Sequence, residues 1–160
     1  MGIKFSYKQS FRIHQRQVGY NAPIFIIAEA GVAHFGSLEK AFQLVDMAVT
    51  AGADAVKFQI FQTKAFISDE SKEWQDRLSS RELPYPAFQE IQAYCEEMGI
   101  VFFATAHDLP SLEFLDTLDV PLYKVGSGEL LNWPFLKQVA SLKKPVILST
   151  GMYKLENIGQ

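Results

Sequence analysis

Polar side chains stand at or near the ends of five apolar segments of this chain, and their types suit the binding and reaction of a small anion. The apolar segments span residues 26–31, 55–59, 101–105, 122–127 and 146–150. The polar residues that they carry are Glu29, Lys57, Thr105, Lys124, Ser127 and Ser149. Two lysines with hydroxyl groups nearby suit a phosphate together with a carboxylate, because ammonium groups form charge-assisted hydrogen bonds with both.

Two carboxylates and two glycines complete this set of residues. Glu29 and Glu129 could supply the acid–base or charge-stabilising groups that a reaction of the bound anion needs. Gly126 and Gly128 flank Ser127, so backbone N–H groups can approach an anion there. A lysine at a strand end can also be a structural ion-pair partner of Glu29, and this alternative stays open for each lysine taken alone.

The histidines and the cysteine carry less information about chemistry. His34 and His107 follow the first and third apolar segments, and two histidines so far apart in sequence are a weak indication of a metal site. We interpret them as structural or merely polar residues. Cys95 is the single cysteine, which excludes an internal disulfide, and its helical spacing with Phe88 and Ile91 predicts a buried thiol.

The elements that must position these residues follow from the apolar spacing. Most of the segments between the strands have helical spacing, so the strands should be parallel and their carboxyl ends should share one face. Ser37, Asp108 and Asn132 are expected to cap three of the helices. Residues 61–86 are expected to form a long irregular loop, with a solvated charged run at 69–77.

The predicted fold class is α/β, a (β/α)8 TIM-type barrel, because such barrels collect catalytic residues from the carboxyl ends of different strands. The chain would contain about the first five β/α units of that barrel, in residues 22–160, preceded by a short β-hairpin in residues 1–21. A closed barrel of this type has about eight strands. We therefore expect a truncated barrel, whether a fragment of a longer protein or a shortened reading frame. The alternative is an open α/β sheet that is complete at this length.

Composition and charge limit the partners. The chain has 160 residues, 48% of them hydrophobic, with a net charge of −3 and a pI near 5.6. This charge gives no overall field for nucleic acid or for an anionic membrane, so neither is expected as a partner. The N-terminus lacks a signal-like apolar stretch, and no segment approaches the roughly 18 apolar residues of a membrane span. A soluble cytoplasmic protein is expected.

Four segments together resemble the N-acetylneuraminate (sialic acid) synthase family. They run in order from the first apolar strand to the last, with family-like spacing, and the resemblance extends from about residue 22 to the end of the chain. The four segments are Ile27-Ala28-Glu29-Ala30-Gly31-Val32-Ala33-His34, Gly52-Ala53-Asp54-Ala55-Val56-Lys57-Phe58-Gln59, Tyr123-Lys124-Val125-Gly126-Ser127-Gly128-Glu129 and Pro145-Val146-Ile147-Leu148-Ser149-Thr150-Gly151-Met152.

The resemblance implies a transferase that condenses phosphoenolpyruvate with N-acetylmannosamine or a related amino-sugar aldehyde, giving a nonulosonic (sialic-type) acid and phosphate. It implies a homodimer in the full-length form and a divalent metal, manganese or magnesium. The metal ligands would come from later strands outside this chain. An antifreeze-like C-terminal domain would also lie outside it. On that basis the chain alone is expected to hold no metal and to be inactive.

The resemblance also implies roles for the candidate residues. The residues implied to be catalytic are Glu29, Lys57 and Glu129. The residues implied to bind substrate are Gln59, Thr105, Lys124, Ser127 and Ser149. Lys57 and the substrate-binding residues would hold phosphoenolpyruvate, with Gln59 nearby, and the two glutamates would act on the sugar, the attacking water or a cationic intermediate.

Two departures from the family pattern affect the acceptor end more than the phosphoenolpyruvate end. Residues 33–36 read Ala-His-Phe-Gly, where the family often has Asn-His-Asn-Gly, and Ala106-His107 stands where Pro-Phe is common. Other functions stay open: a related phosphoenolpyruvate-dependent aldol synthase for a sugar phosphate, a Schiff-base aldolase using Lys124 or Lys57, and a non-catalytic binding or assembly module.

Overall fold

The structure is a computed structural model that describes residues 9–157. A two-stranded antiparallel hairpin, β1 (Ser10–Ile13) and β2 (Arg16–Gly19), precedes a five-stranded parallel sheet. The expected hairpin is confirmed, although residues 1–8 of its predicted range lie outside the described residues. Within residues 9–157, no helix is both long and apolar enough to span a bilayer.

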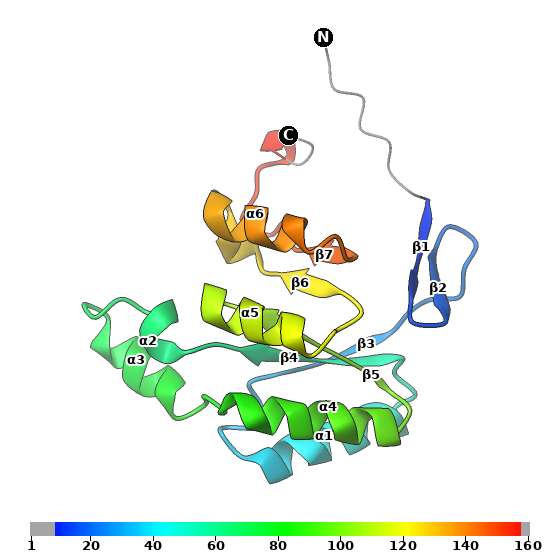
Figure 1. The fold of residues 1–160 in the computed structure, drawn as a ribbon, viewed down its shortest axis with the longest axis horizontal. Coiled ribbons are helices and arrows are strands. Elements are labelled where there is room, and N and C mark those ends of the chain that lie inside the picture. The colour runs from blue at the N-terminus through cyan, green and yellow to red at the C-terminus, as the bar shows by residue number, and fades with distance from the viewer. Residues whose placement is uncertain (1–8, 158–160) are drawn as a thin grey trace.

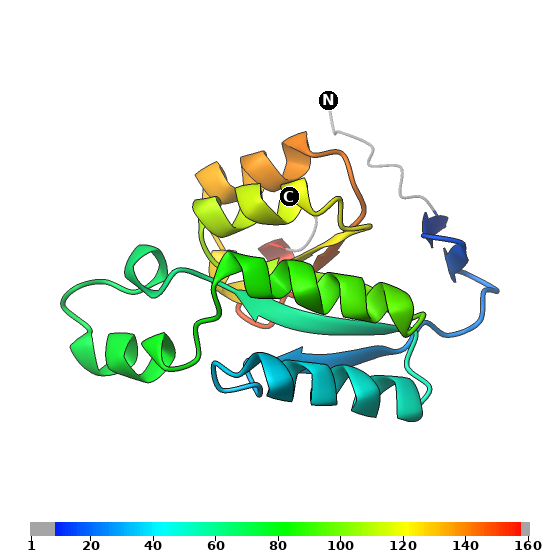
Figure 2. The same cartoon turned by 60° about the horizontal axis from the view of Figure 1, so that its bottom comes forward.

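The sheet has its strands in chain order, and helices connect them (Figure 1). The strands are β3 (Ile27–Gly31), β4 (Ala55–Ile60), β5 (Val101–Ala106), β6 (Tyr123–Val125) and β7 (Val146–Leu148). The main connecting helices are α1 (Leu38–Thr50), α4 (Tyr85–Glu97), α5 (Leu109–Thr117) and α6 (Trp133–Ser141). Two 3-10 turns are η1 (Ser127–Glu129) and η2 (Leu155–Asn157). Figures 1 and 2 show the helices on one side of a curved sheet, which confirms the predicted partial barrel.

The segment after β4 corrects one expectation. Residues 61–86 contain two helices, α2 (Thr63–Phe66) and α3 (Lys72–Ser79), which stand out from the rest of the fold in Figure 2. The charged run at 69–77 therefore lies mostly on a helix. No residue of α3 is buried, so the helix adds nothing to the apolar core from which the other helices were predicted.

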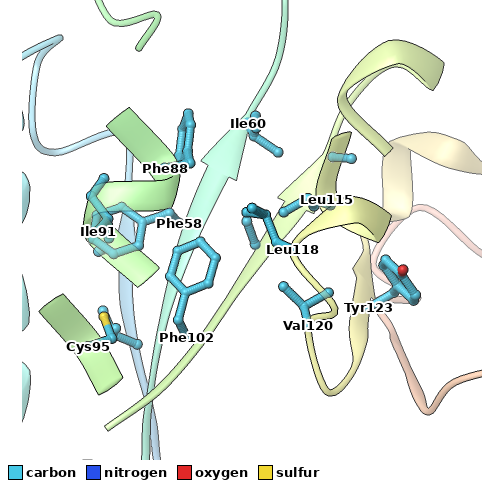
Figure 3. Packing of buried hydrophobic residues seen from close by; sticks show 14 of the residues in the cluster. Phe58, Ile60, Phe88, Ile91, Cys95, Phe102, Leu115, Leu118, Val120 and Tyr123 are labelled. Atoms are coloured by element: carbon cyan, nitrogen blue, oxygen red, sulfur yellow. The ribbon is translucent and has the colours of Figure 1, made fainter. Parts of the chain in front are cut away.

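Alternation along the strands gives the sheet two different faces. The outer face packs on the helices, and Figure 3 shows Phe58 and Phe102 against Phe88 and Ile91 of α4. Cys95 belongs to this core as expected, and burial raises the pKa of its thiol to about 12.

The inner face is apolar only at the end where the strands begin. The fully buried residues of this second cluster are Ile13, Ala55, Phe103 and Leu122. Ile13 comes from the hairpin, so the hairpin closes the bottom of the inner face. Two residues further along β4 and β6 from Ala55 and Leu122, the same face carries Lys57 and Lys124, and the polar site begins there.

The three predicted helix caps are confirmed. Ser37 Oγ accepts from the N–H of Lys40 at 3.3 Å, and Asp108 Oδ1 accepts from the N–H of Ser111 at 2.7 Å. Asn132 Oδ1 accepts from the N–H of Phe135 at 3.4 Å. Each cap starts a helix shortly after the carboxyl end of a strand, so the loops that border the site are short in these three places.

Candidate active site

A cavity of about 500 Å³ lies at the carboxyl ends of the parallel strands. Six of the predicted site residues line it, and they come from all five strands or the residues just after them. These six are Glu29, Lys57, Gln59, Thr105, Lys124 and Ser149. The cavity therefore brings together residues that are far apart in the sequence, from Glu29 on β3 to Ser149 after β7.

Lys57 is the buried centre of this group. Its Nζ lies 2.7 Å from Oε1 of Glu29 on β3 and donates to Oγ1 of Thr105 on β5 at 3.0 Å. Lys57 is 5% exposed, whereas the side chain of Glu29 is 60% exposed. The ion pair considered as a structural alternative is therefore present. It leaves most of the Glu29 carboxylate open to the cavity, so the pair and a chemical role are compatible.

Lys124 is held without a carboxylate. Its Nζ donates to Ser149 Oγ at 2.6 Å and to the carbonyl of Val125 at 2.7 Å, and no ion pair involves it within residues 9–157. Burial, and then the positive charge of Lys57, lower the pKa of Lys124, against an opposite effect of Glu29. An anion bound between the lysines would relieve this repulsion and would favour the charged form of Lys124.

Lys57 and Lys124 lie at different levels of the sheet, although both stand near the carboxyl ends of their strands. Lys57 pairs in register with Phe103, whereas Lys124 pairs with Thr105, two residues higher on β5. Lys57 reaches the upper layer through its long side chain, because its Nζ contacts Thr105 Oγ1. The backbone positions therefore differ in level, while both side chains reach the same cavity.

Ser127 and Glu129 lie beside the cavity, in η1, and are not among the residues that line it. Glu129 is 8% exposed, and its Oε2 accepts a hydrogen bond from Nδ2 of Asn132 at 2.6 Å. A Cβ placed on Gly151 would lie 3.7 Å from Ser127 Oγ. Their predicted roles in catalysis and binding stay predictions.

His107 lines the cavity, which sequence reasoning missed. Its ring stacks on Phe66 with centroids 4.7 Å apart, and its Nε2 is buried without a partner among the described residues. Burial, followed by the charges of Lys57 and Lys124, lowers the pKa of His107 to about 4, although Asp108 acts in the opposite direction. The imidazole is therefore neutral at pH 7.

Arg81 and Phe35 also line the cavity and were not predicted. The guanidinium carbon of Arg81 lies 4.8 Å from the centroid of the Phe35 ring. The contact joins the loop after β3 to the segment between α3 and α4, so no local spacing could indicate it. The only sequence signal was that Phe35 stands where an amide is common in the family that the chain resembles.

The described residues do not fit a metal centre. No group of three or more His, Cys, Asp or Glu side chains in residues 9–157 is placed to hold an ion. His34, the other histidine near the site, is 1% exposed, and its Nδ1 accepts from the N–H of Gly36 at 3.1 Å. Burial lowers the pKa of His34 to about 4. His34 therefore shapes the loop after β3.

Comparison of the sequence with known proteins identifies related enzymes. The NeuB family profile matches residues 44–160. A human N-acetylneuraminate-9-phosphate synthase is 38% identical over 157 residues, covering 91% of this chain and 44% of that protein. An N,N'-diacetyllegionaminic acid synthase of Campylobacter jejuni is 39% identical over 146 residues, covering 83% of this chain and 44% of that protein.

A solved structure agrees with these sequence matches. A sialic acid synthetase of Leptospira borgpetersenii, in complex with citrate, superposes with a TM-score of 0.89 at 33% identity and covers 94% of this chain and 52% of that one. The chain spans somewhat less than half the length of the curated relatives cited above. Since the family profile covers well over half of the chain, this chain belongs to the NeuB family.

Proposed function

We propose that the full-length protein condenses phosphoenolpyruvate with an N-acylated amino-sugar aldehyde to give a nonulosonic acid and phosphate. The observation that carries this proposal is the meeting of Lys57 and Lys124 in one cavity with a single carboxylate, Glu29, bound to one of them. Such a cavity has an excess of positive charge, which suits a substrate with both a phosphate and a carboxylate. The relatives named as sialic-type acid synthases support the same reaction class.

In this proposal the residues of the chain hold the enol substrate and manage charge. Lys57, Lys124 and the hydroxyls of Thr105 and Ser149 bind the phosphate and the carboxylate. Carbon 3 of phosphoenolpyruvate then forms a bond to the aldehyde carbon with the electron pair of the carbon 2–carbon 3 double bond. The aldehyde oxygen takes up a proton and becomes a hydroxyl, and water adds at the electron-poor carbon 2. Phosphate leaves as the bond between carbon 2 and the bridging oxygen breaks. Glu29, exposed beside Lys57, is placed to take the proton of that water.

The metal, the assembly and the location belong to the proposal as well. A divalent ion, manganese or magnesium, would act on the aldehyde, and residues outside this chain would hold it, because the described residues do not fit one. We also propose a cytoplasmic homodimer, with Ser127 and Glu129 contributing from η1 at the edge of the cavity.

The test uses the full-length protein with phosphoenolpyruvate that carries heavy oxygen in its ester bridge. We expect a new acid of the mass of the condensed product, with the label in the released phosphate and not in the sugar acid. Adding a chelator should stop phosphate release. Phosphate release that chelation leaves unaffected, or a label retained in the product, would count against the proposed reaction.

A borohydride control separates the Schiff-base alternative. Incubation with pyruvate and borohydride should leave the mass of the protein unchanged, because the proposed reaction forms no imine. A stable adduct on Lys57 or Lys124 would instead identify an aldolase. A full-length protein that binds phosphoenolpyruvate and consumes none with any amino sugar would favour the binding or assembly module.

A further inference from the structure

The wall of the cavity next to β3 includes a positively charged side chain, Arg81, that has no role in the proposed reaction. Arg81 lines the cavity from the segment between α3 and α4, and its guanidinium lies against the exposed ring of Phe35. Phe35 follows β3, at one edge of the sheet. Lys124 lies on β6, and Ser149 follows β7, the strand at the other edge. Strands β4 and β5 lie between β3 and β6.

The backbone fixes Arg81 in this position. Gly36 has a φ of +75°, and a Cβ there would lie 2.6 Å from the carbonyl oxygen of Ser80, so only glycine allows the two segments to lie so close. Phe35 itself has a φ of +49°, and its N–H donates to the carbonyl of Val32 at 3.1 Å. The loop after β3 is therefore a tight, hydrogen-bonded turn that holds the ring in place.

Arg81 has no anionic partner among residues 9–157. The neighbouring carboxylate, Glu82, is committed elsewhere, because its Oε2 accepts from the N–H of Thr63 at 2.8 Å and from the Thr63 hydroxyl at 2.6 Å. A guanidinium carries its N–H donors around its edge, so contact with the ring leaves donors for a phosphate or carboxylate in two-point contact.

We propose that Arg81, which lies over the ring of Phe35, is a specificity-determining residue. It binds a second anionic group, carried by the acceptor, so that the acceptor is a phosphorylated amino sugar. This inference rests on the proposed function and names its substrate class. Lys57 of β4 and Lys124 of β6 hold the phosphate and carboxylate of phosphoenolpyruvate. Arg81, beside the loop after β3, holds the phosphate ester of the sugar.

The chain offers a matched control in Lys40. Its Nζ lies 5.7 Å from the centroid of the same Phe35 ring, and Lys40 is not among the residues that line the cavity. Replacing either residue by methionine removes one positive charge beside Phe35. Only the Arg81 replacement removes a donor that faces the substrate.

The experiment measures kcat/KM of the full-length protein for N-acetylmannosamine and for its 6-phosphate. We expect the wild type to prefer the phosphorylated acceptor. Arg81→Met should reduce that preference about 10- to 100-fold, as expected for the loss of a charge-assisted contact. Phe35→Leu should reduce it about two- to fivefold, because the cation–π contact at an exposed ring is weaker. Lys40→Met should change it less than twofold.

The outcomes separate this inference from the reaction itself. A wild type that prefers the unphosphorylated sugar, or equal effects of Arg81→Met and Lys40→Met, would overturn the inference and leave the condensation intact. A wild type that forms no product with either sugar would overturn both. Melting curves of the variants, expected to match that of the wild type, show whether a lost preference reflects lost folding.

Discussion

The surroundings of Lys124 in the cavity disfavour its positive charge. Burial and the nearby Lys57 lower its pKa, and its two hydrogen bonds go to neutral oxygens of Ser149 and Val125. Lys57, in contrast, has a carboxylate at 2.7 Å. Lys124 is therefore the ammonium group whose environment improves most when an anion enters, and its contribution to binding should be large.

We predict that Lys124→Met in the full-length protein weakens phosphoenolpyruvate binding by about 1.5 to 3 kcal/mol, or about 10- to 150-fold, because one charge-assisted contact is lost. Titration calorimetry measures the affinity. Lys137→Met is the matched control, since Lys137 is an exposed lysine of α6 that does not line the cavity. If the two variants bind equally well and both are folded, the role of Lys124 is structural.

The sequence was sufficient to predict Lys57, Thr105, Lys124 and Ser149, because each stands at the end of a recognisable apolar strand and parallel strands end together. It was not sufficient for Arg81. The contact between Arg81 and Phe35 depends on how two irregular segments pack, and neither segment has a periodic pattern. The sequence also could not predict which lysine forms an ion pair with Glu29, because this depends on strand register and on how far each side chain reaches.

At the scale of elements, the helices that bury an apolar stripe were predictable, and those that do not were missed. α1 and α4 place apolar side chains against the sheet, whereas α3 buries none. Yet the segment from α2 to α4 carries Arg81 into the cavity. Its position is fixed by the close approach of Gly36 to Ser80 and by the bonds of Glu82 to Thr63.

We predict that Gly36→Ala lowers the free energy of unfolding by about 2 to 4 kcal/mol, because a methyl group would both strain the backbone and meet the Ser80 carbonyl. Gly52→Ala is the matched control. Its φ of +72° is nearly the same, and nothing lies within 4 Å of the added atom, so it should cost only about 1 kcal/mol. Denaturant unfolding of the full-length variants measures both values. Equal costs would show that the contact between the two segments is not tight.

At the scale of the whole molecule, the described sheet ends at β3 and β7, each with one neighbouring strand. The outer side chains of β7 are poorly covered, with Val146 41% and Leu148 46% exposed. Unpaired strand edges with apolar side chains favour pairing with other chains. The closed barrel predicted for the full-length protein would remove both edges.

We therefore predict that residues 1–160 expressed alone will self-associate or melt without a sharp transition, since two edges of the sheet would lack partners. Sedimentation velocity and thermal melting test this, with the full-length protein as the comparison. A monomer with a sharp cooperative melt would show that these residues form a complete small domain, and the truncated-barrel interpretation would be wrong.

The alternation of side chains along β4 also limits which changes in chain length this protein can tolerate. Val56 and Phe58 enter the apolar layer under the helices, and Lys57 between them enters the cavity. One residue inserted in the strand before Lys57 would turn each following side chain to the opposite face of the sheet. The ammonium group of Lys57 would then lie in the apolar layer, and the ring of Phe58 would lie among the residues that line the cavity. Insertions and deletions should therefore accumulate outside the sheet, as in the segment from α2 to α4, while strand segments keep their length or change it by two residues at a time.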